Sequence, residues 1–432
     1  MKLFFQKFNN KLDAQGGFLK SVSVLVGGTA FAQALAVLVL PLITRIYSPE
    51  EFALFAVYTS IVSILTVAVC LRFEIAIPLP EKDEDALSLF MLSLISNIML
   101  TTILVIVIFF FQESIFKLIQ QPQLKPYKWL IPIGVFLAGL YNAFQYWATR
   151  QKQFGTIAQT RMTQAVFSST VQIGAGYLGF STIGLLFGQI INFSAGIIKL
   201  FAYFLKETKH SFTQLSMQRL KENWKNYDKF PKYSTFEALA NIISIQLPII
   251  IIAAVAIGPE AGYLMLAMKV MAIPMGLVGG AIGQVYLAHA PEYYKKNDLK
   301  KYTVQTIYQI AKITVIPLII IGTIAPYIFP IVFGENWAKA GYMLLWMVPW
   351  FIMQILSSPV SMALHITANQ KIALILQFVG FILRVGGLWL VSIYFSIWVF
   401  EYYAISGFIF YLIYLLVIIY VLKDTVNELK RV

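Results

Sequence analysis

Long apolar stretches alternate with short polar segments along almost the whole chain. A transmembrane helix needs about 20 apolar residues to cross about 30 Å of hydrocarbon. Runs of this length occur at residues 21–44, 51–79, 86–111, 128–148, 162–180, 183–205, 234–257, 261–289, 303–330, 341–364, 372–394 and 398–422. The pattern predicts an all-α, polytopic membrane protein with about twelve transmembrane helices.

Turn residues set some of the helix boundaries. Ser48-Pro49-Glu50-Glu51 predicts a helix that begins near Pro49, because Ser48 can cap free backbone N–H groups and the acids face the positive end of the helix dipole. The shortest separation, Gly179-Phe180-Ser181, predicts a tight turn between two spans. A second Pro-Glu turn at Pro259-Glu260 resembles the first and indicates an internal duplication.

Composition supports a membrane protein. Apolar residues make up 59% of the chain and charged residues only 12%, whereas soluble domains contain about a quarter charged residues. The only cysteine, Cys70, cannot form an internal disulfide. The N-terminal segment is basic, but the apolar run that follows is too long for a signal peptide. We expect an uncleaved first span, preceded by an interfacial helix over residues 3–12.

The net charge of +13 raises the question of a nucleic-acid partner, and the positions of the basic residues answer it. With a cytoplasmic N-terminus, 23 of the 33 Lys and Arg residues fall in inner segments, 5 in outer loops and 5 within spans. This distribution follows the positive-inside rule. It predicts cytoplasmic termini, contact with membrane lipids and no nucleic acid.

The longest polar segment divides the chain into two halves. Residues 206–232 form a basic cytoplasmic linker between an N-terminal six-helix lobe at 1–205 and a C-terminal six-helix lobe at 233–432. Six crossings return the chain to its starting side, so the two lobes are parallel. Parallel repeats of this kind place a substrate site near the bilayer midplane.

Two cations fall near the middle of predicted spans. Arg384 is 13 residues from Lys371 and 10 from Tyr394, and Lys269 is 9 residues beyond Glu260. Burying a charge there costs about 2.5–3.5 kcal/mol on insertion scales, which indicates a function. We expect Arg384 and Lys269 to bind an anion in a cavity; the alternative is a buried ion pair or contact with helix carbonyls.

Arg72 and Glu74 lie eight and six residues before Pro80, about a third of the way into the second span from its cytoplasmic end. On one continuous helix, positions i and i+2 point to different faces, which predicts that they do not pair. Arg72 either binds an anion or extends to the inner interface. Glu74 is too short to extend as far and is the candidate for a protonatable carboxylate.

Amide side chains recur at span depth, where they either join helices or line a wet cavity suited to hydroxyl-rich cargo. They are Gln33, Asn97, Asn142, Gln145, Gln164, Gln172, Gln189, Asn192, Asn241, Gln246, Gln284, Gln354 and Gln377.

Enzymatic motifs are absent or weak. The sequence contains no phosphate-binding G-x-x-x-x-G-K-[ST] loop and no H-E-x-x-H, and its three histidines are scattered. Asp83-Glu84-Asp85 contains the D-x-D of sugar-nucleotide enzymes, but it stands in a short loop without a nucleotide-binding domain, so we interpret it as a chance match. We expect no enzymatic activity, no cofactor and no metal site.

One stretch resembles a known family. Pro41, Arg45, Tyr47, the Pro49-Glu50-x-Phe52 turn and the segment Leu71-Arg72-Phe73-Glu74-Ile75-Ala76 are similar to the start of bacterial polysaccharide exporters and O-antigen flippases. These belong to the multidrug, oligosaccharidyl-lipid and polysaccharide exporter superfamily. The match covers about an eighth of the chain.

The resemblance implies a MATE-like fold whose two lobes alternate between inward-open and outward-open states. It implies a secondary transporter that flips an undecaprenyl-pyrophosphate-linked oligosaccharide, an O-antigen or capsule repeat unit, from the cytoplasmic to the outer leaflet of the bacterial inner membrane. Arg384, Lys269 and Arg72 would then bind the pyrophosphate, with Glu74 as the candidate for proton coupling. Polysaccharide polymerase and other assembly proteins are candidate partners.

Two alternatives remain open. A multidrug antiporter of the same superfamily would need acids deep in its cavity, whereas the mid-depth charges here are positive. A membrane enzyme of polysaccharide assembly usually carries a large outer loop, whereas the longest outer loop predicted here, residues 112–127, is short.

Overall fold

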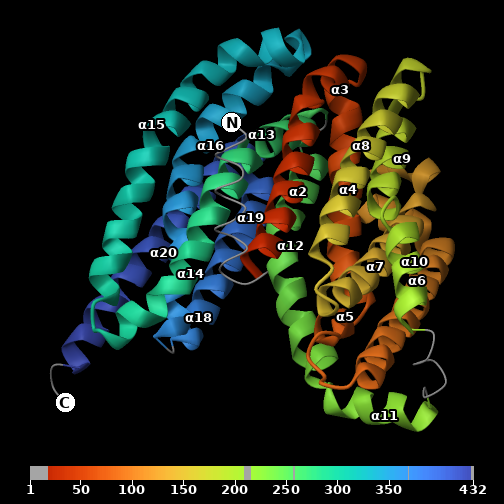
Figure 1. Ribbon diagram of the computed structural model, residues 1–432. Coiled ribbons are helices and arrows are strands. Elements are labelled where there is room, and N and C mark those ends of the chain that lie inside the picture. The colour runs from red at the N-terminus through yellow and green to blue at the C-terminus, as the bar shows by residue number, and fades with distance from the viewer. Residues whose placement is uncertain (1–17, 209–215, 256–257, 368, 430–432) are drawn as a thin grey trace, which may run out of the picture. The chain divides into compact units, whose positions relative to one another are not determined.

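The computed structural model describes residues 18–208, 216–255, 258–367 and 369–429, and these residues form helices and turns without any β-strand (Figure 1). The predicted interfacial helix at 3–12 lies outside the described residues. The helices of the first part of the chain are α2 (Phe18–Leu38), α3 (Leu40–Ile46), α4 (Pro49–Val69), α5 (Phe73–Ala76), α6 (Asp83–Leu118), η1 (Pro122–Tyr127), α7 (Leu130–Arg150), α8 (Phe154–Tyr177), α9 (Ser181–Ser194), α10 (Ile197–Thr208), α11 (Met217–Asn226), η3 (Phe230–Ser234) and α12 (Thr235–Val255).

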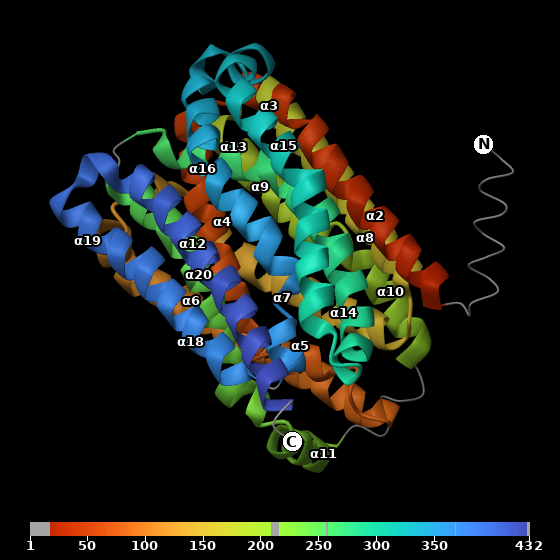
Figure 2. The same ribbon diagram turned by 90° about the vertical axis from the view of Figure 1, so that its left-hand side faces the viewer.

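Helices also make up the second part of the chain, where α14, α15 and α16 can be followed in Figure 2. They are α13 (Glu260–Pro274), η4 (Met275–Gly279), α14 (Gly280–Lys295), α15 (Leu299–Phe333), η5 (Glu335–Trp337), α16 (Ala338–Ser357), η6 (Ser358–Val360), α17 (Ala363–Ile366), α18 (Gln370–Phe381), η7 (Ile382–Gly386), α19 (Gly387–Tyr394), η8 (Ser396–Trp398) and α20 (Val399–Leu429). Three segments, η3, η4 and η7, are π-helical.

Within the described ranges, nine helices are long and apolar enough to cross a membrane. The helices over the predicted spans 128–148, 162–180 and 261–289 are not among these nine. Two of the excluded helices, α7 and α8, contain several amide and hydroxyl side chains, which lowers their apolar content. The total of twelve spans therefore stays a prediction.

The chain divides into two compact units. Unit 1 comprises residues 1–47 and 58–246, and unit 2 comprises residues 48–57 and 247–432. The first residues of α4 therefore belong to unit 2, and the rest of that helix belongs to unit 1. The lobes predicted at 1–205 and 233–432, with a linker at 206–232, stay a prediction.

The start of α4 agrees with its turn chemistry. The Ser48 Oγ accepts a hydrogen bond from the Glu51 N–H at 3.3 Å, and the Ser48 N–H donates to Glu51 Oε2 at 2.7 Å. This reciprocal pair is a capping box, which satisfies two backbone donors at the helix end. Gly179, with φ of 81°, makes the turn between α8 and α9 that its sequence predicts.

The predicted span at 51–79 is not one helix. Helix α4 ends at Val69, Leu71 and Arg72 adopt left-handed φ values of 50° and 61°, and the short helix α5 begins at Phe73. The turn directs Phe73 and Ile77 into the core of unit 1, where both are fully buried. The prediction that Arg72 and Glu74 do not pair assumed a continuous helix and is wrong.

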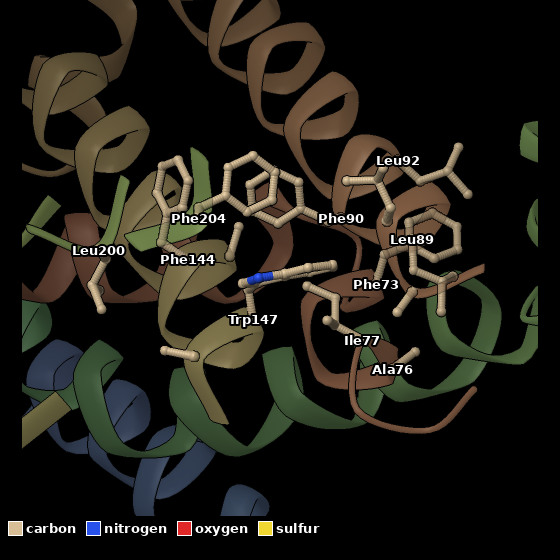
Figure 3. Close-up of a cluster of buried hydrophobic side chains, with 14 of the residues drawn as sticks. Phe73, Ala76, Ile77, Leu89, Phe90, Leu92, Phe144, Trp147, Leu200 and Phe204 are labelled. Atoms are coloured by element: carbon tan, nitrogen blue, oxygen red, sulfur yellow. The ribbon is translucent and has the colours of Figure 1, made fainter. Parts of the chain in front are cut away.

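An aromatic cluster forms part of the core of unit 1. Figure 3 shows Trp147 between Phe73 and Ile77 on one side and Phe144 and Phe204 on the other. The Trp147 and Phe204 rings meet edge to face with their centroids 5.2 Å apart, a preferred geometry for aromatic pairs. This cluster joins α5 to α7 and α10 and fixes where the chain resumes after the turn.

Candidate functional site

A cavity of about 310 Å³ lies in unit 1 beside the turn between α4 and α5. Helices α4, α5, α7, α8 and α9 contribute its lining side chains, together with the turn at Arg72. Its lining residues are Ser63, Thr66, Val67, Arg72, Glu74, Ala138, Tyr141, Asn142, Gln164, Asn192 and Phe193. The cavity thus combines one cation, one carboxylate and several neutral polar groups.

The charged pair of this cavity is loosely joined. Arg72 Nη1 lies 3.9 Å from Glu74 Oε1, and the Arg72 and Glu74 side chains are 26% and 4% exposed. Glu74 Oε2 and Arg72 Nε are buried and have no hydrogen-bond partner among the described residues. Buried polar groups are nearly always paired in proteins, so these two atoms offer one acceptor and one donor to a ligand, a proton or water.

Neutral polar groups complete the cavity. Tyr141 and Thr160 share a hydrogen bond of 3.0 Å between their hydroxyls. The Thr66 hydroxyl is buried without a partner within the described part of the chain, and the amides of Asn142, Gln164 and Asn192 also line the space. Hydroxyls and amides both donate and accept hydrogen bonds, which suits the hydroxyl groups of sugars.

Other amides from the predicted set join helices instead. The Asn97 amide donates to the Phe136 carbonyl at 3.0 Å, and the Gln172 amide donates to the Leu185 carbonyl at 3.4 Å. The Ser60 hydroxyl donates to Gln246 Oε1 at 2.9 Å. Some of the predicted amides therefore join helices, whereas Asn142, Gln164 and Asn192 line the cavity.

Arg384 lies in unit 2, outside this cavity. It stands in the π-helical segment η7, is 5% exposed, and donates from Nη2 to the Tyr403 hydroxyl at 3.0 Å. Its guanidinium carbon lies 4.7 Å from the centroid of the Trp350 ring and 5.2 Å from that of Tyr403. Among the described residues it has no carboxylate within ion-pair distance, and its Nε has no partner. Aromatic rings provide its surroundings.

Lys269 has yet another environment in unit 2. Its Nζ lies 4.9 Å from the centroid of the Phe55 ring, which belongs to the part of α4 in unit 2. The structure therefore brings Arg72 and Glu74 together, whereas neither Lys269 nor Arg384 lines their cavity. Depth along a helix, estimated from residue counts, does not say which way a side chain points.

The acidic triplet Asp83-Glu84-Asp85, which was expected in a loop, forms the first turn of α6 and has partners that sequence reasoning missed. Arg150 Nη2 lies 2.8 Å from Asp83 Oδ1, and Arg219 Nη1 lies 3.2 Å from Glu84 Oε2. The excess of basic residues on the same predicted side of the membrane was the available signal. In the part of the chain that the structure covers, no group of His, Cys, Asp and Glu side chains is arranged to hold a metal ion.

Comparison with known proteins gives a family and a fold. The family described as polysaccharide biosynthesis protein matches residues 42–342. No curated protein matches the sequence. Among solved structures, the lipid II flippase MurJ in an inward closed conformation has a TM-score of 0.69 at 16% identity, over 91% of this chain and 86% of that one.

Multidrug resistance MATE transporters of the MOP superfamily have similar structures as well. An inward-facing conformation gives a TM-score of 0.62 at 15% identity, over 94% of this chain and 96% of the other. An outward-facing conformation gives 0.57 at 14% identity, over 95% and 96%. These likenesses confirm the predicted all-α, MATE-like fold class. The chain belongs to the polysaccharide biosynthesis protein family and is a multi-pass membrane protein with the fold shared by MurJ and the MATE transporters.

Proposed function

We propose that this protein is a secondary transporter that flips an undecaprenyl-pyrophosphate-linked oligosaccharide, an O-antigen or capsule repeat unit, to the outer leaflet by alternating access. Its family acts in polysaccharide biosynthesis, and its fold is similar to that of a lipid II flippase. The observation that carries the proposal is the unit 1 cavity, which combines the Arg72 guanidinium with amide and hydroxyl side chains.

In this proposal, the pyrophosphate and the sugars of the cargo each bind a different kind of side chain. Arg72 binds the pyrophosphate, because a guanidinium forms charge-assisted hydrogen bonds with phosphate oxygens. The amides of Asn142, Gln164 and Asn192 bind sugar hydroxyls. Lys269 and Arg384 add positive charge within unit 2, where each now contacts aromatic rings.

The energetics allow transport without a coupled ion. A pyrophosphate with about two negative charges that leaves a cytoplasm at about −100 mV moves downhill by roughly 4.6 kcal/mol. A proton carried by Glu74 is therefore permitted but not required. Glu74 remains the candidate for such coupling, because its buried Oε2 has no partner among the described residues.

The setting of the proposal is the bacterial inner membrane, with both termini in the cytoplasm. Membrane lipids surround the protein, and a polysaccharide polymerase and other assembly proteins use its product. In this scheme the protein performs no enzymatic reaction. A multidrug antiporter is the second candidate, since the MATE structures share its fold. The family match and the arginine in the cavity favour the anionic cargo.

The test is a flipping assay with purified protein in proteoliposomes. A fluorescent undecaprenyl-pyrophosphate-linked oligosaccharide is placed in both leaflets, and an impermeant lectin outside reports the sugar that becomes accessible with time. We expect translocation above that of protein-free vesicles. Translocation at the protein-free rate, together with proton-driven efflux of a cationic dye, would replace the flippase with the antiporter.

A further inference from the structure

Helix α11, which lies within the predicted linker, is fixed to the start of α6 (Figure 1). Arg219 forms ion pairs with Glu84 at 3.2 Å and with Asp85 at 3.7 Å, and the Asn223 amide donates to Asp85 Oδ1 at 3.1 Å. The Ser216 hydroxyl caps the helix by accepting from the Arg219 N–H at 3.2 Å. These contacts hold α11 against the first turn of α6, within unit 1.

An aromatic contact joins α11 to Phe73, a neighbour of two cavity residues in the chain. The ring of Trp224, which is 43% exposed, lies 5.0 Å from the ring of the fully buried Phe73. Phe73 is the first residue of α5 and stands between Arg72 and Glu74 in the chain. Trp224 therefore covers the residue that separates the two charged groups of the cavity, although Trp224 does not line the cavity itself.

The turn that carries Arg72 depends on such outside contacts. Leu71 and Arg72 both adopt left-handed backbone conformations, which cost non-glycine residues free energy and persist only where surrounding structure enforces them. Helix α5 has four residues, too few to form a stable helix alone. The burial of Phe73 is thus part of what keeps the turn in place.

We infer that Trp224 is a positioning residue, which holds Phe73 and thereby the Arg72–Glu74 pair at the cavity wall. The importance of this contact for transport rests on the proposed function. Because the linker joins the two predicted lobes in sequence, a displacement of α11 reaches the charged pair through the contact of Trp224 with Phe73. The linker then does more than set topology: it controls the geometry of the cavity.

The single cysteine of the protein reports on this turn. Cys70 is 1% exposed, its thiol donates to the Gly139 carbonyl at 3.5 Å, and it precedes Arg72 by two residues. Its rate of alkylation by N-ethylmaleimide, measured by mass spectrometry on protein in nanodiscs, follows the opening of the turn. We expect Trp224→Ala to raise the rate about threefold to tenfold, the range given by losing one aromatic pair.

Matched variants make this measurement specific. Trp224→Phe retains a ring against Phe73 and is expected to restore the wild-type alkylation rate. Trp389→Ala removes an exposed tryptophan of α19 in unit 2 and should leave the rate unchanged. A wild-type alkylation rate in folded Trp224→Ala would overturn the inference. If that variant fails to fold, Arg219→Gln takes its place with Lys221→Gln as control, and an unchanged rate in Arg219→Gln overturns the inference equally.

The alkylation assay contains no lipid-linked oligosaccharide, so its result is independent of the proposed cargo. A wild-type protein that fails to flip the oligosaccharide removes the proposed function and leaves the contact intact. Where flipping is observed, Trp224→Ala should slow it and Trp224→Phe should restore it. Normal flipping by a Trp224→Ala protein whose Cys70 is rapidly alkylated would deny the contact any role in transport.

Discussion

Each unit contains an arginine within a predicted span, and the surroundings of the two arginines differ. In unit 1, Arg72 lines a cavity, pairs loosely with Glu74 at 3.9 Å and keeps a free Nε among the described residues. In unit 2, Arg384 is enclosed by Trp350 and Tyr403 and donates to a tyrosine hydroxyl. The first arginine has room beside it for a ligand, and the second is covered by aromatic side chains.

The difference shows two ways in which a protein can accommodate a cation within a predicted membrane span. It can face a polar cavity, where incomplete pairing leaves its hydrogen bonds available to a ligand. It can instead exchange hydration for cation–π contacts, which are worth more as the site is desolvated. Mutation of a cation that faces a cavity, such as Arg72, should reduce transport. Mutation of a cation enclosed by aromatic rings, such as Arg384, should also reduce stability.

The largest expected effect is on the stability of unit 2. Arg384→Ala removes a buried hydrogen bond and two ring contacts, so we expect the free energy of unfolding to fall by about 3 kcal/mol. Equilibrium unfolding of the purified protein in mixed micelles measures this change. Arg384→Lys keeps the charge but loses the planar contact, and its loss should be smaller. Unchanged stability in both variants would mean that the aromatic contacts contribute little.

The next effect concerns transport through unit 1. Arg72→Ala removes the guanidinium from the cavity wall, and we expect flipping to slow by about tenfold to 150-fold, because a hydrogen bond to a charged group is worth about 1.5–3 kcal/mol. The proteoliposome assay measures the rate, and a thermal unfolding curve verifies the fold. Lys199→Ala is the control, since Lys199 is an exposed cation of unit 1 that does not line the cavity. Equal slowing in both variants would assign the effect to general charge.

The helical fold and several helix boundaries could be predicted from sequence, because they depend on local chemistry. The apolar runs predicted helices in a membrane protein, and Ser48 with Glu51 placed the start of α4 correctly. The break after Val69 could not be predicted, because Leu71 and Arg72 carry no glycine or proline signal at the turn. It depends on where Phe73 and Ile77 find their packing partners, which is a property of the tertiary structure.

The candidate site could be predicted in part, because charged residues within apolar runs stand out in a sequence. The residues identified in this way are Arg72, Glu74, Lys269 and Arg384. Which of them share a cavity depends on side-chain direction and on helix packing, and neither is encoded in residue spacing. Nothing in the sequence around Trp224 indicated its role, because that role depends on a contact with Phe73, which lies 151 positions earlier in the chain.

A smaller effect is expected at Lys269. Its ammonium group contacts the Phe55 ring at 4.9 Å, and a contact of this kind is worth about 0.5–2 kcal/mol. If Lys269 adds positive charge to the cargo path, Lys269→Ala should slow flipping about fivefold and Lys269→Arg should retain most of the rate. The proteoliposome assay at low and high salt measures both variants. A wild-type rate in Lys269→Ala would remove this residue from the proposed binding set.

The smallest change in rate is expected at Glu74, and it sharpens the comparison most. Glu74→Gln keeps the size of the side chain and one acceptor oxygen but cannot exchange a proton in the cavity. If Glu74 carries a proton during transport, flipping by the wild type changes with pH, whereas flipping by Glu74→Gln stays nearly constant at a rate within about threefold of the wild type's best. The measurement is the initial flipping rate from pH 5 to pH 9, a range chosen to include the physiological one. Curves that coincide for the two proteins would remove Glu74 as a proton carrier, because the wild type would then gain nothing from its ionisable side chain.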